Sequence, residues 1–560
     1  MTQFMTQDER IGQQMRIRLF MLATAMAFLC AWVAQATPVR YHSATVPIEA
    51  GRSVTLSSAK GPVYLRSHTT GPTMFGMSEQ RYRFTVGSAK KPMATAWVTV
   101  RTLDTGSRVV FARLSSPAQS VPLTMTLSTD TDTYSMHPFN IKASSAYSTR
   151  HGIDRTSGPW GWVELGGSDA TTSSVFVSKA YGFRTLRKNY GHGKSSSAKL
   201  LLSERNLLSV DTARNHLVNV NLGLSATKAS CERYFLLEDG SIVDTNTPKA
   251  LVSTVTATDA CWLDPTGCYE KGPYSIEPET RDGYVRSLLD MRSDDVIDAY
   301  AHTGSPFMED LLLNDVYSLG LIRSADGLWR TNYTSTWVKS ESHIVAPYVD
   351  TRHNEGIALS SARIADLLTS AGVVPADGIR AWGSPYASFL SRRAAAGAVI
   401  RTAHGFYFSD YYDASGKARC HASLNHSLGE MNYLLVRSGD SSSTPQFALA
   451  MKIKSAIDDT GRHWIRPNSD LWYQRNLNGK FQGTDYPTVT YFDLLNSQAL
   501  LVKLTGQRDA TFDRLIASKA KYLKGIGVSV PSSISEERLV GPSTEPQIPV
   551  QTGTSEDRLP

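Results

Sequence analysis

Short runs that alternate hydrophobic and polar residues fill the chain from about residue 46 to residue 237. Gly, Ser, Asp and Pro separate the runs, and clear examples are residues 53–56 and 96–100. Alternation with a period of two places the hydrophobic side chains on one face of a strand. Many short strands of this kind in succession predict an antiparallel β-sandwich over residues 37–240.

A helical rhythm replaces this alternation near residue 282, where hydrophobic residues begin to recur three and four positions apart. The spacing predicts helices in eight segments: 282–301, 307–323, 354–371, 378–403, 421–437, 445–458, 488–505 and 508–524. Eight helices make four helical hairpins, and short links alternate with long, aromatic-rich ones. This organisation predicts an incomplete α/α toroid over residues 282–526, with a cleft lined by the long linkers at one end.

The N-terminus has the features of a signal peptide over residues 1–36. Arg16 and Arg18 precede a hydrophobic run from residue 19 to residue 33, and Ala-Gln-Ala follows at residues 34–36. The run is shorter than a membrane span. We therefore expect a protein exported to a bacterial periplasm or secreted, although retention of the leader would leave an N-terminal anchor.

Two further regions complete the predicted organisation. Residues 241–281 form a connector, in which Cys261 and Cys268 could form a disulfide in an oxidising compartment. Ser, Pro, Glu and Thr dominate residues 527–560, which predicts a disordered tail.

Charge and motifs narrow the possible partners. The chain has 58 Lys and Arg residues against 51 Asp and Glu residues, which gives a formal charge of +7. This mild excess suits attraction to a polyanion. Its even spread along the chain disfavours nucleic acid as a partner. The sequence contains no phosphate-binding Gly-rich loop, no Gly-x-Ser-x-Gly elbow, no zinc-binding helix motif and no EF-hand loop, so we expect neither a cofactor nor a metal.

Aromatic, imidazole and carboxylate side chains concentrate in three of the long linkers, near residues 330–356, 404–426 and 463–490. Aromatic faces stack on sugar rings, and Arg and His neutralise acid groups. A Tyr phenol beside such cations can move a proton. The linkers therefore predict a carbohydrate site for an acidic polysaccharide.

Specific segments of these linkers resemble a known family. Asp410 and Tyr411 precede residues 423–426 (Ser-Leu-Asn-His), and two further segments follow at residues 470–475 and 486–490. In order and position they are similar to an acidic residue beside Tyr, a Leu-Asn-Gly helix, a Tyr-Asp-Leu-Arg-His segment and a Tyr-His-Thr-Thr-His segment. These motifs belong to the C-terminal helical domain of the glucuronyl C5-epimerases, which invert C5 of glucuronate units in a polymer. The resemblance implies an α/α-toroid enzyme that modifies a uronate polysaccharide.

The resemblance also implies which residues carry the reaction. Tyr411, Tyr473 and Tyr486 occupy positions similar to the proton carriers of the family, and His426 and Asp410 complete the predicted catalytic group. The predicted substrate-binding residues are Arg352, His353, Glu355, Asn425, Arg466, Trp472, Arg475 and Trp337.

Two reactions that begin with removal of the C5 proton remain open. An epimerase needs two proton carriers on opposite faces of the sugar ring, and Tyr473 with Tyr486 could supply them. A polysaccharide lyase needs one carrier at C5 and a donor to the departing oxygen at C4, which a Tyr and His426 could supply.

Two other functions are alternatives. A glycoside hydrolase would pair Asp350 or Glu355 with Asp410, Asp413 or Asp485 across the cleft. A noncatalytic protein that binds glycans or assists assembly of the envelope is the hypothesis from another class.

Overall fold

The computed structural model describes residues 43–49, 51–138, 148–149, 152–153, 161–166, 173–212, 217–242, 262–272, 275–278, 283–292, 294–372, 376–416 and 420–533. The predicted leader and most of the predicted tail lie outside these ranges. Cys261 of the predicted disulfide also lies outside them, while Cys268 carries a free thiol. The bridge therefore stays a prediction.

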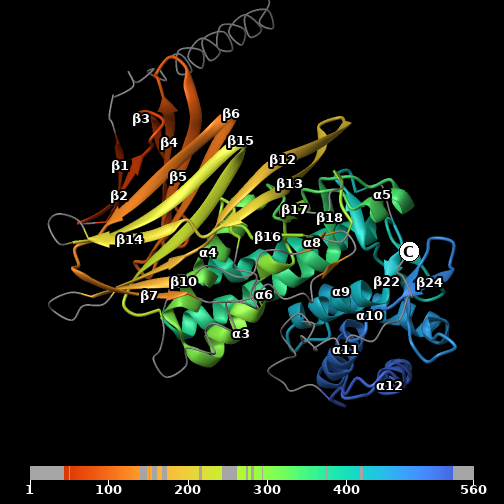
Figure 1. Ribbon diagram of the computed structural model, residues 1–560. Coiled ribbons are helices and arrows are strands. Elements are labelled where there is room, and N and C mark those ends of the chain that lie inside the picture. The colour runs from red at the N-terminus through yellow and green to blue at the C-terminus, as the bar shows by residue number, and fades with distance from the viewer. Residues whose placement is uncertain are drawn as a thin grey trace, which may run out of the picture.

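A large antiparallel sheet forms the N-terminal half of the described chain (Figure 1). Hydrogen bonds connect fifteen strands, with the order β16-β17-β13-β12-β15-β6-β5-β4-β3 along the longest path. The strands are β1 (Ala44–Glu49), β2 (Arg52–Ser57), β3 (Val63–Thr70), β4 (Ser78–Gly87), β5 (Pro92–Thr102), β6 (Arg108–Ser128), β7 (Thr133–Pro138), β10 (Gly161–Gly166), β11 (Ser173–Val177), β12 (Ala180–Gly191), β13 (Lys194–Arg205), β14 (Leu208–Thr212), β15 (Val218–Asp239), β16 (Glu270–Lys271) and β17 (Gly283–Arg286). A separate short hairpin joins β8 (Ser148–Thr149) and β9 (Gly152–Ile153).

The two longest strands hold this sheet together. β6 and β15 pair with each other along most of their 21 and 22 residues. Near its two ends, β6 also pairs with β5 and with β2, and β15 pairs with β11 and β14. Alternate hydrophobic residues of these strands form a buried core that includes Val98, Leu127 and Leu222. The predicted antiparallel β domain is present, but strand pairing does not divide it into the two sheets of the predicted sandwich.

Helices dominate the C-terminal half, which confirms the prediction of a mixed β and α chain. They are α3 (Asp294–Thr303), α4 (Pro306–Ile322), α5 (Thr336–Ser342), α6 (Thr351–Ser370), α7 (Asp377–Arg380), α8 (Ser384–Ala395), α9 (Leu424–Arg437), α10 (Pro445–Thr460), α11 (Val489–Thr505) and α12 (Ala510–Gly525). Each predicted helical segment contains a helix. In the first segment the helix α3 occupies only the C-terminal part, because β17 and a short 3-10 turn precede it. No helix in the described part of the chain is long and hydrophobic enough to cross a membrane.

The C-terminal helices pack in two layers. α9 contacts α6, α10 and α11, and α12 contacts α11. α6, α9 and α11 bury most of their residues, whereas α10 and α12 bury mainly one face. An inner row of buried helices with an outer row of amphipathic ones is the packing that an α/α toroid repeats. The complete toroid of four hairpins stays a prediction.

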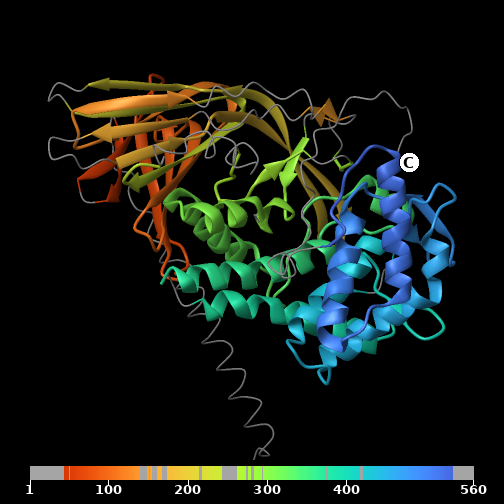
Figure 2. The ribbon, with the colours of Figure 1, turned by 90° about the horizontal axis from the view of Figure 1, so that it is seen from below.

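The helical half is anchored on the sheet through α3 and α4, which lie between the sheet and the C-terminal helices (Figure 2). Phe307 at the start of α4 packs against Phe176 of β11, with 4.7 Å between the ring centroids. Buried Arg101 of β5 donates hydrogen bonds to Asn314 and Ser318 of α4. These contacts fix the two halves against one another.

Short strand pairs bring the long linkers together. β18 (Tyr348–Asp350) pairs with β21 (Tyr411–Asp413), so that Asp350 lies opposite Tyr411. β22 (Ala422–Ser423) pairs with β23 (Trp472–Arg475), which pairs with β24 (Phe481–Thr484). β19 (Ile400–Arg401) and β20 (Phe406–Tyr407) form another pair. Residues from all three predicted linkers therefore meet beside the N-termini of α6 and α9.

Candidate active site

Seven aromatic rings from the three linkers form a continuous cluster. This aromatic cluster consists of Trp337, Tyr348, Tyr411, His421, His426, Tyr473 and Tyr486. The ring of Trp337 lies 4.9 Å from that of His421 and 6.1 Å from that of Tyr473. Tyr486 is 45% exposed and Tyr411 is 9% exposed, so the cluster leads from the surface into the interior.

Helix caps hold the inner end of the cluster. The Asp350 carboxylate caps α6 by accepting a hydrogen bond from the backbone N–H of His353 at 3.0 Å. The Ser423 hydroxyl caps α9 by accepting from the N–H of His426. Capping side chains satisfy N–H groups that a helix start leaves without partners. Both caps stand directly beside predicted catalytic residues and therefore fix their backbone positions.

His421 is held between two carboxylates. Its Nε2 lies 3.2 Å from Oδ2 of Asp410, and its Nδ1 lies 3.1 Å from Oε2 of Glu341. Burial alone lowers the pKa of an imidazole, but the charge of Asp410 and the contacts with both carboxylates outweigh it and raise the pKa of His421 to about 9. His421 is therefore a cation at neutral pH.

His426 has the opposite protonation. Burial lowers its pKa below the ordinary value, although the charges of Asp410 and Asp350 act against this shift. The single proton of the Thr351 hydroxyl is donated to the carbonyl oxygen of Asp410, at 3.0 Å. The Thr351 oxygen, 2.8 Å from Nδ1 of His426, must then accept a hydrogen bond from that nitrogen. The lowered pKa favours the neutral form of His426, and a proton on Nδ1 leaves the lone pair on Nε2, which lies 3.8 Å from Oδ2 of Asp410.

Tyr411 and Tyr473 are protonated phenols. Burial raises both pKa values well above 10, and the negative charges of Asp350 and Asp410 raise them further. A tyrosine that serves as a base needs the reverse, a phenolate favoured by positive charge. Of the two roles open to a proton carrier, these raised pKa values favour that of proton donor over that of base.

Three predicted substrate-binding residues lie behind the aromatic cluster. Arg352 is 8% exposed, and its guanidinium lies 3.2 Å from Glu355 and 2.9 Å from Asp493. It also donates a hydrogen bond to the carbonyl oxygen of Asn425 at 3.3 Å. Their contacts with one another and with Asp493 hold α6, α9 and α11 together. Nearby, burial and the charge of Asp410 raise the pKa of Glu430 well above its ordinary value.

Of four other predicted residues, two lie in or beside the aromatic cluster and two lie elsewhere. Trp337 lies inside the cluster, and His353 lies at its edge, 3.4 Å from Asp350. Trp472 lies next to Tyr473 in β23, but alternation turns it to the other face of the strand, where Arg466 covers its ring at 4.9 Å. Arg466 also pairs with Asp470 at 3.2 Å.

Two further predicted residues lie outside the cluster. Arg475 pairs in register with Ala422 in the strand ladder, and its charge acts on the buried hydroxyl of Tyr407. Asp485, a candidate for the hydrolase pair, lies 2.8 Å from the fully buried Nζ of Lys519. Asp485 therefore has a buried partner in Lys519, which gives it a packing role.

Three members of the site are absent from the predicted residues: Tyr348 of β18, His421 and Glu341. His421 belongs to the second linker, and Glu341 belongs to α5 in the first linker. Trp337 and Glu341 are four residues apart, which places them on one helical face, and the Trp337 indole donates to Glu341 at 3.1 Å. The four-residue spacing of Trp337 and Glu341 is visible in the sequence and could have placed Glu341 in the site. It was not used, because no helix was predicted over the residues of α5.

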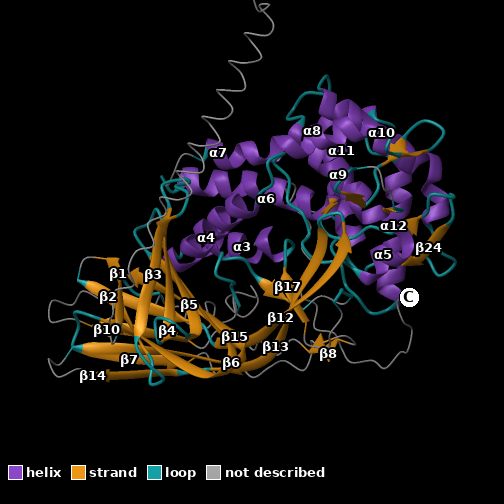
Figure 3. Cartoon of the chain, turned by 90° about the horizontal axis from the view of Figure 1, so that it is seen from above, coloured by secondary structure: helices purple, strands orange, loops and turns teal. Residues whose placement is uncertain are grey.

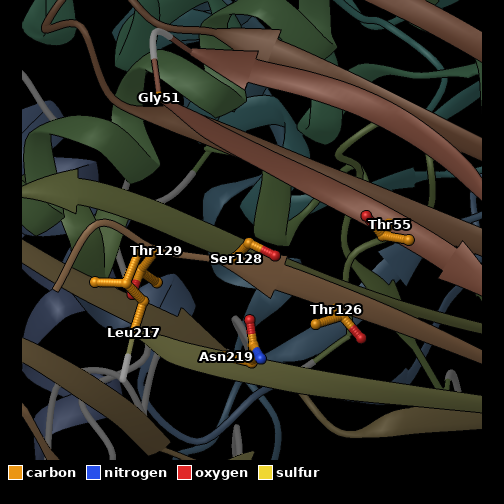
Figure 4. Close-up of a pocket in the computed structure, with 7 residues that line it drawn as sticks. All are labelled: Gly51, Thr55, Thr126, Ser128, Thr129, Leu217 and Asn219. Carbon is orange, nitrogen blue, oxygen red and sulfur yellow. The ribbon is translucent and has the colours of Figure 1, made fainter. Parts of the chain in front are cut away.

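A separate hollow of about 490 Å³ lies on the sheet, over β2, β6 and β15 (Figure 4). Hydroxyl and amide side chains line it, including Thr55, Thr126, Ser128 and Asn219. Its lining contains no acid or base for proton transfer, in contrast to the aromatic cluster. Across the described ranges, no group of three or more His, Cys, Asp or Glu side chains is arranged to hold a metal ion.

Comparison with known proteins found no matching protein-family model and no matching curated protein. Among solved structures, D-mannose isomerase aligns with 50% of this chain and 71% of its own, at 11% identity and a TM-score of 0.34. Cellobiose 2-epimerase from Bacillus thermoamylovorans B4167 aligns with 43% of this chain and 60% of its own, at 9% identity and a TM-score of 0.33. A family 76 glycoside hydrolase from a bovine Bacteroides thetaiotaomicron strain aligns with 87% of this chain and 77% of its own, at 8% identity and a TM-score of 0.35. All three are named as carbohydrate-active enzymes, and the similarities are too weak to assign the chain to a family.

Proposed function

We propose that this chain is an enzyme that cleaves a uronate-containing polysaccharide by elimination across C4 and C5. The observation that carries the proposal is the contact between a neutral base and a protonated phenol. The ring of His426 lies 5.7 Å from the ring of Tyr411, in an edge-on contact. The pKa of His426 is lowered and that of Tyr411 is raised, so the two groups favour the protonation states that a base and an acid require.

The proposed step conserves protons and electrons. Nε2 of His426 accepts the proton from C5, and the electrons of that C–H bond form the C4–C5 double bond. The bond between C4 and its glycosidic oxygen breaks, and this oxygen receives the phenolic proton of Tyr411. Proton transfer from the His426 imidazolium to the Tyr411 phenolate then restores the starting state. Positioned acids and bases of this kind typically contribute about 10²- to 10⁴-fold to a rate.

His421 supplies the positive charge that this chemistry needs. Removal of a proton beside a carboxylate creates a dianion, which a fixed cation stabilises. The His421 ring contacts both Trp337 and Tyr473, so its charge would lie beside a sugar stacked on these rings, and Asp410 and Glu341 contact its two nitrogens. Trp337 and Tyr473 would hold the sugar ring itself.

The arrangement of the tyrosines favours elimination over epimerisation. Epimerisation by Tyr473 and Tyr486 requires a sugar ring between them. Their centroids are 5.7 Å apart, and the rings meet edge to face in direct contact. No hexuronate ring fits into that separation, whereas elimination needs no sugar ring between Tyr411 and His426, whose rings also contact one another at 5.7 Å.

Glycoside hydrolysis is the second candidate, and the carboxylates favour it. Asp350 ends β18 and Asp410 directly precedes β21, and both charges act on Tyr411 and Tyr473. Together with Glu341 they outnumber the one cationic imidazole, which suits a neutral sugar better than an acidic one. In this reaction the protonated His421 would donate to the leaving oxygen, and a carboxylate would assist attack on the anomeric carbon.

The reaction products distinguish elimination, hydrolysis and epimerisation from one another. The wild-type protein should be incubated with alginate, polygalacturonate, hyaluronate and neutral mannan. Elimination produces an unsaturated uronate that absorbs ultraviolet light, and hydrolysis produces reducing ends without that absorbance. Epimerisation in D₂O places deuterium at C5 without cleavage. The proposal predicts unsaturated product from at least one uronate polymer, and reducing ends alone would support the hydrolase instead.

Export is part of the proposal, because large polysaccharides occur outside the cytoplasm. The leader predicted at residues 1–36 supports it. N-terminal sequencing of the protein recovered from periplasm and medium tests this point. A mature N-terminus near residue 37 is the expected result, and an intact N-terminus in the cytoplasm would contradict it.

A further inference from the structure

The short helix α5 carries two residues of the candidate site, Trp337 and Glu341, but has little packing of its own. Val338 is the one buried residue among the seven of α5. Burial of a single Val contributes little against the conformational entropy that is lost when seven residues are ordered, and a helix of this length is not stable by itself in water. Contacts with other elements must therefore hold α5 beside the aromatic cluster.

A carboxylate between β16 and β17 supplies such contacts. Glu277 accepts a hydrogen bond from the Tyr190 hydroxyl of β12 at 2.6 Å, and Lys339 of α5 donates to its two oxygens at 2.8 and 3.0 Å. Lys188 of β12 lies 3.0 Å from the same carboxylate. The Lys339 ammonium also lies 5.4 Å from the centre of the Tyr190 ring. Tyr190, Glu277 and Lys339 together form what we call the α5 clamp.

Charge and hydrogen bonds stabilise the α5 clamp. Burial raises the pKa of Glu277, but the hydrogen bonds from Lys339, Tyr190 and Lys188 outweigh this effect and lower the pKa to about 2. Glu277 is therefore ionised at neutral pH. Burial and the hydrogen bond to Glu277 raise the pKa of Tyr190 to about 12, so its hydroxyl keeps the proton that it donates.

The backbone ahead of α5 is connected to the same part of the β domain. β12 and β13 leave the sheet and reach toward α5 (Figure 3). The N–H of Thr334 donates to the Ser196 hydroxyl of β13 at 2.9 Å, and the Thr334 carbonyl oxygen accepts from the N–H of Glu277 at 2.8 Å. The Ser335 hydroxyl then caps α5 by accepting from the N–H of Val338. The hairpin of β12 and β13 therefore fixes the position at which α5 begins.

The α5 clamp and the aromatic cluster lie on opposite sides of α5. Trp337 and Glu341 are four residues apart and share one face of the helix, whereas Lys339 is two residues from each and lies on the other side. Oε2 of Glu341 lies 3.1 Å from Nδ1 of His421, and the Trp337 ring lies 4.9 Å from the His421 ring. A displacement of α5 would therefore remove a carboxylate and an aromatic ring from His421.

We infer that the three residues of the α5 clamp are positioning residues, which hold α5 against the β domain and thereby keep Glu341 in contact with His421. The β domain then completes a site whose aromatic cluster comes entirely from the helical half. The consequence for the reaction rests on the proposed function, whereas the consequence for His421 rests on these contacts alone.

The titration of His421 reports whether Glu341 is in place. Among the described residues, the titratable groups that face the His421 ring are Glu341, Asp410, Tyr411, His426 and Tyr473. Burial lowers the pKa of His421, but Asp410 and Glu341 raise it, and it reaches about 9. Glu341 is the member of this group that belongs to α5, so loss of the α5 clamp removes one of the two carboxylate contacts.

The test measures the pKa of His421 by NMR in the full-length protein labelled with ¹⁵N-histidine, and the spectrum of His421→Gln assigns the signal. Lys339→Met removes the ammonium of the α5 clamp and retains the length of the side chain, whereas Lys339→Arg retains a cation. Lys454→Met is the matched control, because Lys454 pairs with Asp458 at 2.7 Å and with Asp509, neither of which belongs to the aromatic cluster.

The inference predicts a pKa of about 9 for His421 in the wild type, in the control and in Lys339→Arg. In Lys339→Met the pKa should be lower by about one unit or more, as expected when a carboxylate moves away. Tyr190→Phe, which removes one hydroxyl and leaves the ring in place, should shift the pKa in the same direction, and it replaces Lys339→Met if that variant does not fold. An unchanged titration in the clamp variant, or an equal shift in Lys454→Met, would overturn the inference.

Catalysis supplies a readout that separates this inference from the proposed function. At pH 9, a pKa lower by one unit reduces the cationic fraction of His421 from about one half to about one tenth. Lys339→Met should therefore lower kcat on the preferred uronate polymer about fivefold at this pH and move the basic limb of the pH profile to lower pH. If no polymer is cleaved but the pKa of His421 still falls in Lys339→Met, the proposed reaction fails and the positioning role stands. If Lys339→Met cleaves the polymer with an unchanged kcat and pH profile, the proposed function stands and the inference fails.

Discussion

The imidazole of His421 lies 3.2 Å from the carboxylate of Asp410, in a part of the site from which water is largely excluded. The pair connects the residues that directly precede β21 and β22, and Glu341 on the other side of the His421 ring connects them to α5. His421 is therefore a structural cation as well as a candidate for contact with substrate. Its charge state should govern both the stability and the activity of the protein.

The first prediction concerns the pH dependence of stability. The pKa of His421 is about 9 in the folded state, against 6.5 for the free side chain. Because the folded pKa is the higher one, the stabilisation is complete below pH 6.5 and is lost as the pH rises through 9. A shift of this size corresponds to about 3 kcal/mol. Urea unfolding at pH 6 should show a larger free energy of unfolding for the wild type than for His421→Gln. At pH 10 this difference should be smaller by about this amount. A gap independent of pH would contradict the assigned charge.

A buried carboxylate in the β domain should give a second effect of pH. Burial, with the nearby charges of Asp310 and Glu309, raises the pKa of Glu238 from 4.5 to about 8. The folded state holds this proton more tightly than the unfolded state, so stability falls as the pH rises from about 4.5 through about 8. Glu238→Gln should therefore raise the free energy of unfolding at pH 9 by on the order of 5 kcal/mol and should have little effect at pH 4. Asp132→Asn, at an exposed carboxylate, is the control, and an equal gain there would rule out the explanation.

Close packing behind the site leads to a third prediction. A Cβ atom at Gly429 of α9 would lie 2.1 Å from Arg352 and 2.7 Å from Glu355. Gly429→Ala should therefore displace this ion pair and destabilise the protein by about 1 to 3 kcal/mol, although Ala normally favours a helix. Gly525→Ala, where a Cβ would meet nothing within 4 Å, is the matched control and should not destabilise. Chemical denaturation measures the free energy of unfolding of both variants. Equal values for the two would show that the Arg352–Glu355 pair can move without a loss of stability.

The fourth prediction separates a packing role from a catalytic one. Lys519 is fully buried, 2.6 Å from Asp470 and 2.8 Å from Asp485. Lys519→Met leaves two buried carboxylates without their cation and should cost about 3 to 5 kcal/mol. Lys503→Met, at an exposed pair with Asp440, should change stability by less than about 0.5 kcal/mol. Asp485→Asn should lower stability but leave the rate of the folded fraction unchanged, whereas a hydrolase that uses Asp485 would lose that rate.

Sequence periodicity predicted the helices well because their hydrophobic spacing extends over many residues. Segments 445–458 and 508–524 contain α10 and α12 almost completely. The short strands β18 and β21 have three residues each, too few for any pattern to be visible. Yet their pairing is what places Asp350 opposite Tyr411 and assembles the site.

Residue type predicted which linkers meet but not which partners their charged side chains contact. Arg352 and Asp485 are charged residues shortly before or within a predicted helix, and sequence alone favoured contact with substrate. Their true partners, Asp493 and Lys519, are 141 and 34 residues away and become visible only in the fold. His421 shows the converse, because its partner Glu341 is 80 residues away in the sequence and gave no local signal.

The central claim, that His426 and Tyr411 carry out elimination, is tested most directly by the initial rate of ultraviolet absorbance increase on the preferred uronate polymer. Tyr411→Phe retains the ring contacts but removes the acid, and it should lower this rate by at least about 100-fold. His426→Gln should do the same, while Tyr491→Phe, whose hydroxyl bonds to the carbonyl of Pro531, should react like the wild type. Release of reducing ends with no absorbance, or an unchanged rate in Tyr411→Phe, would contradict the account.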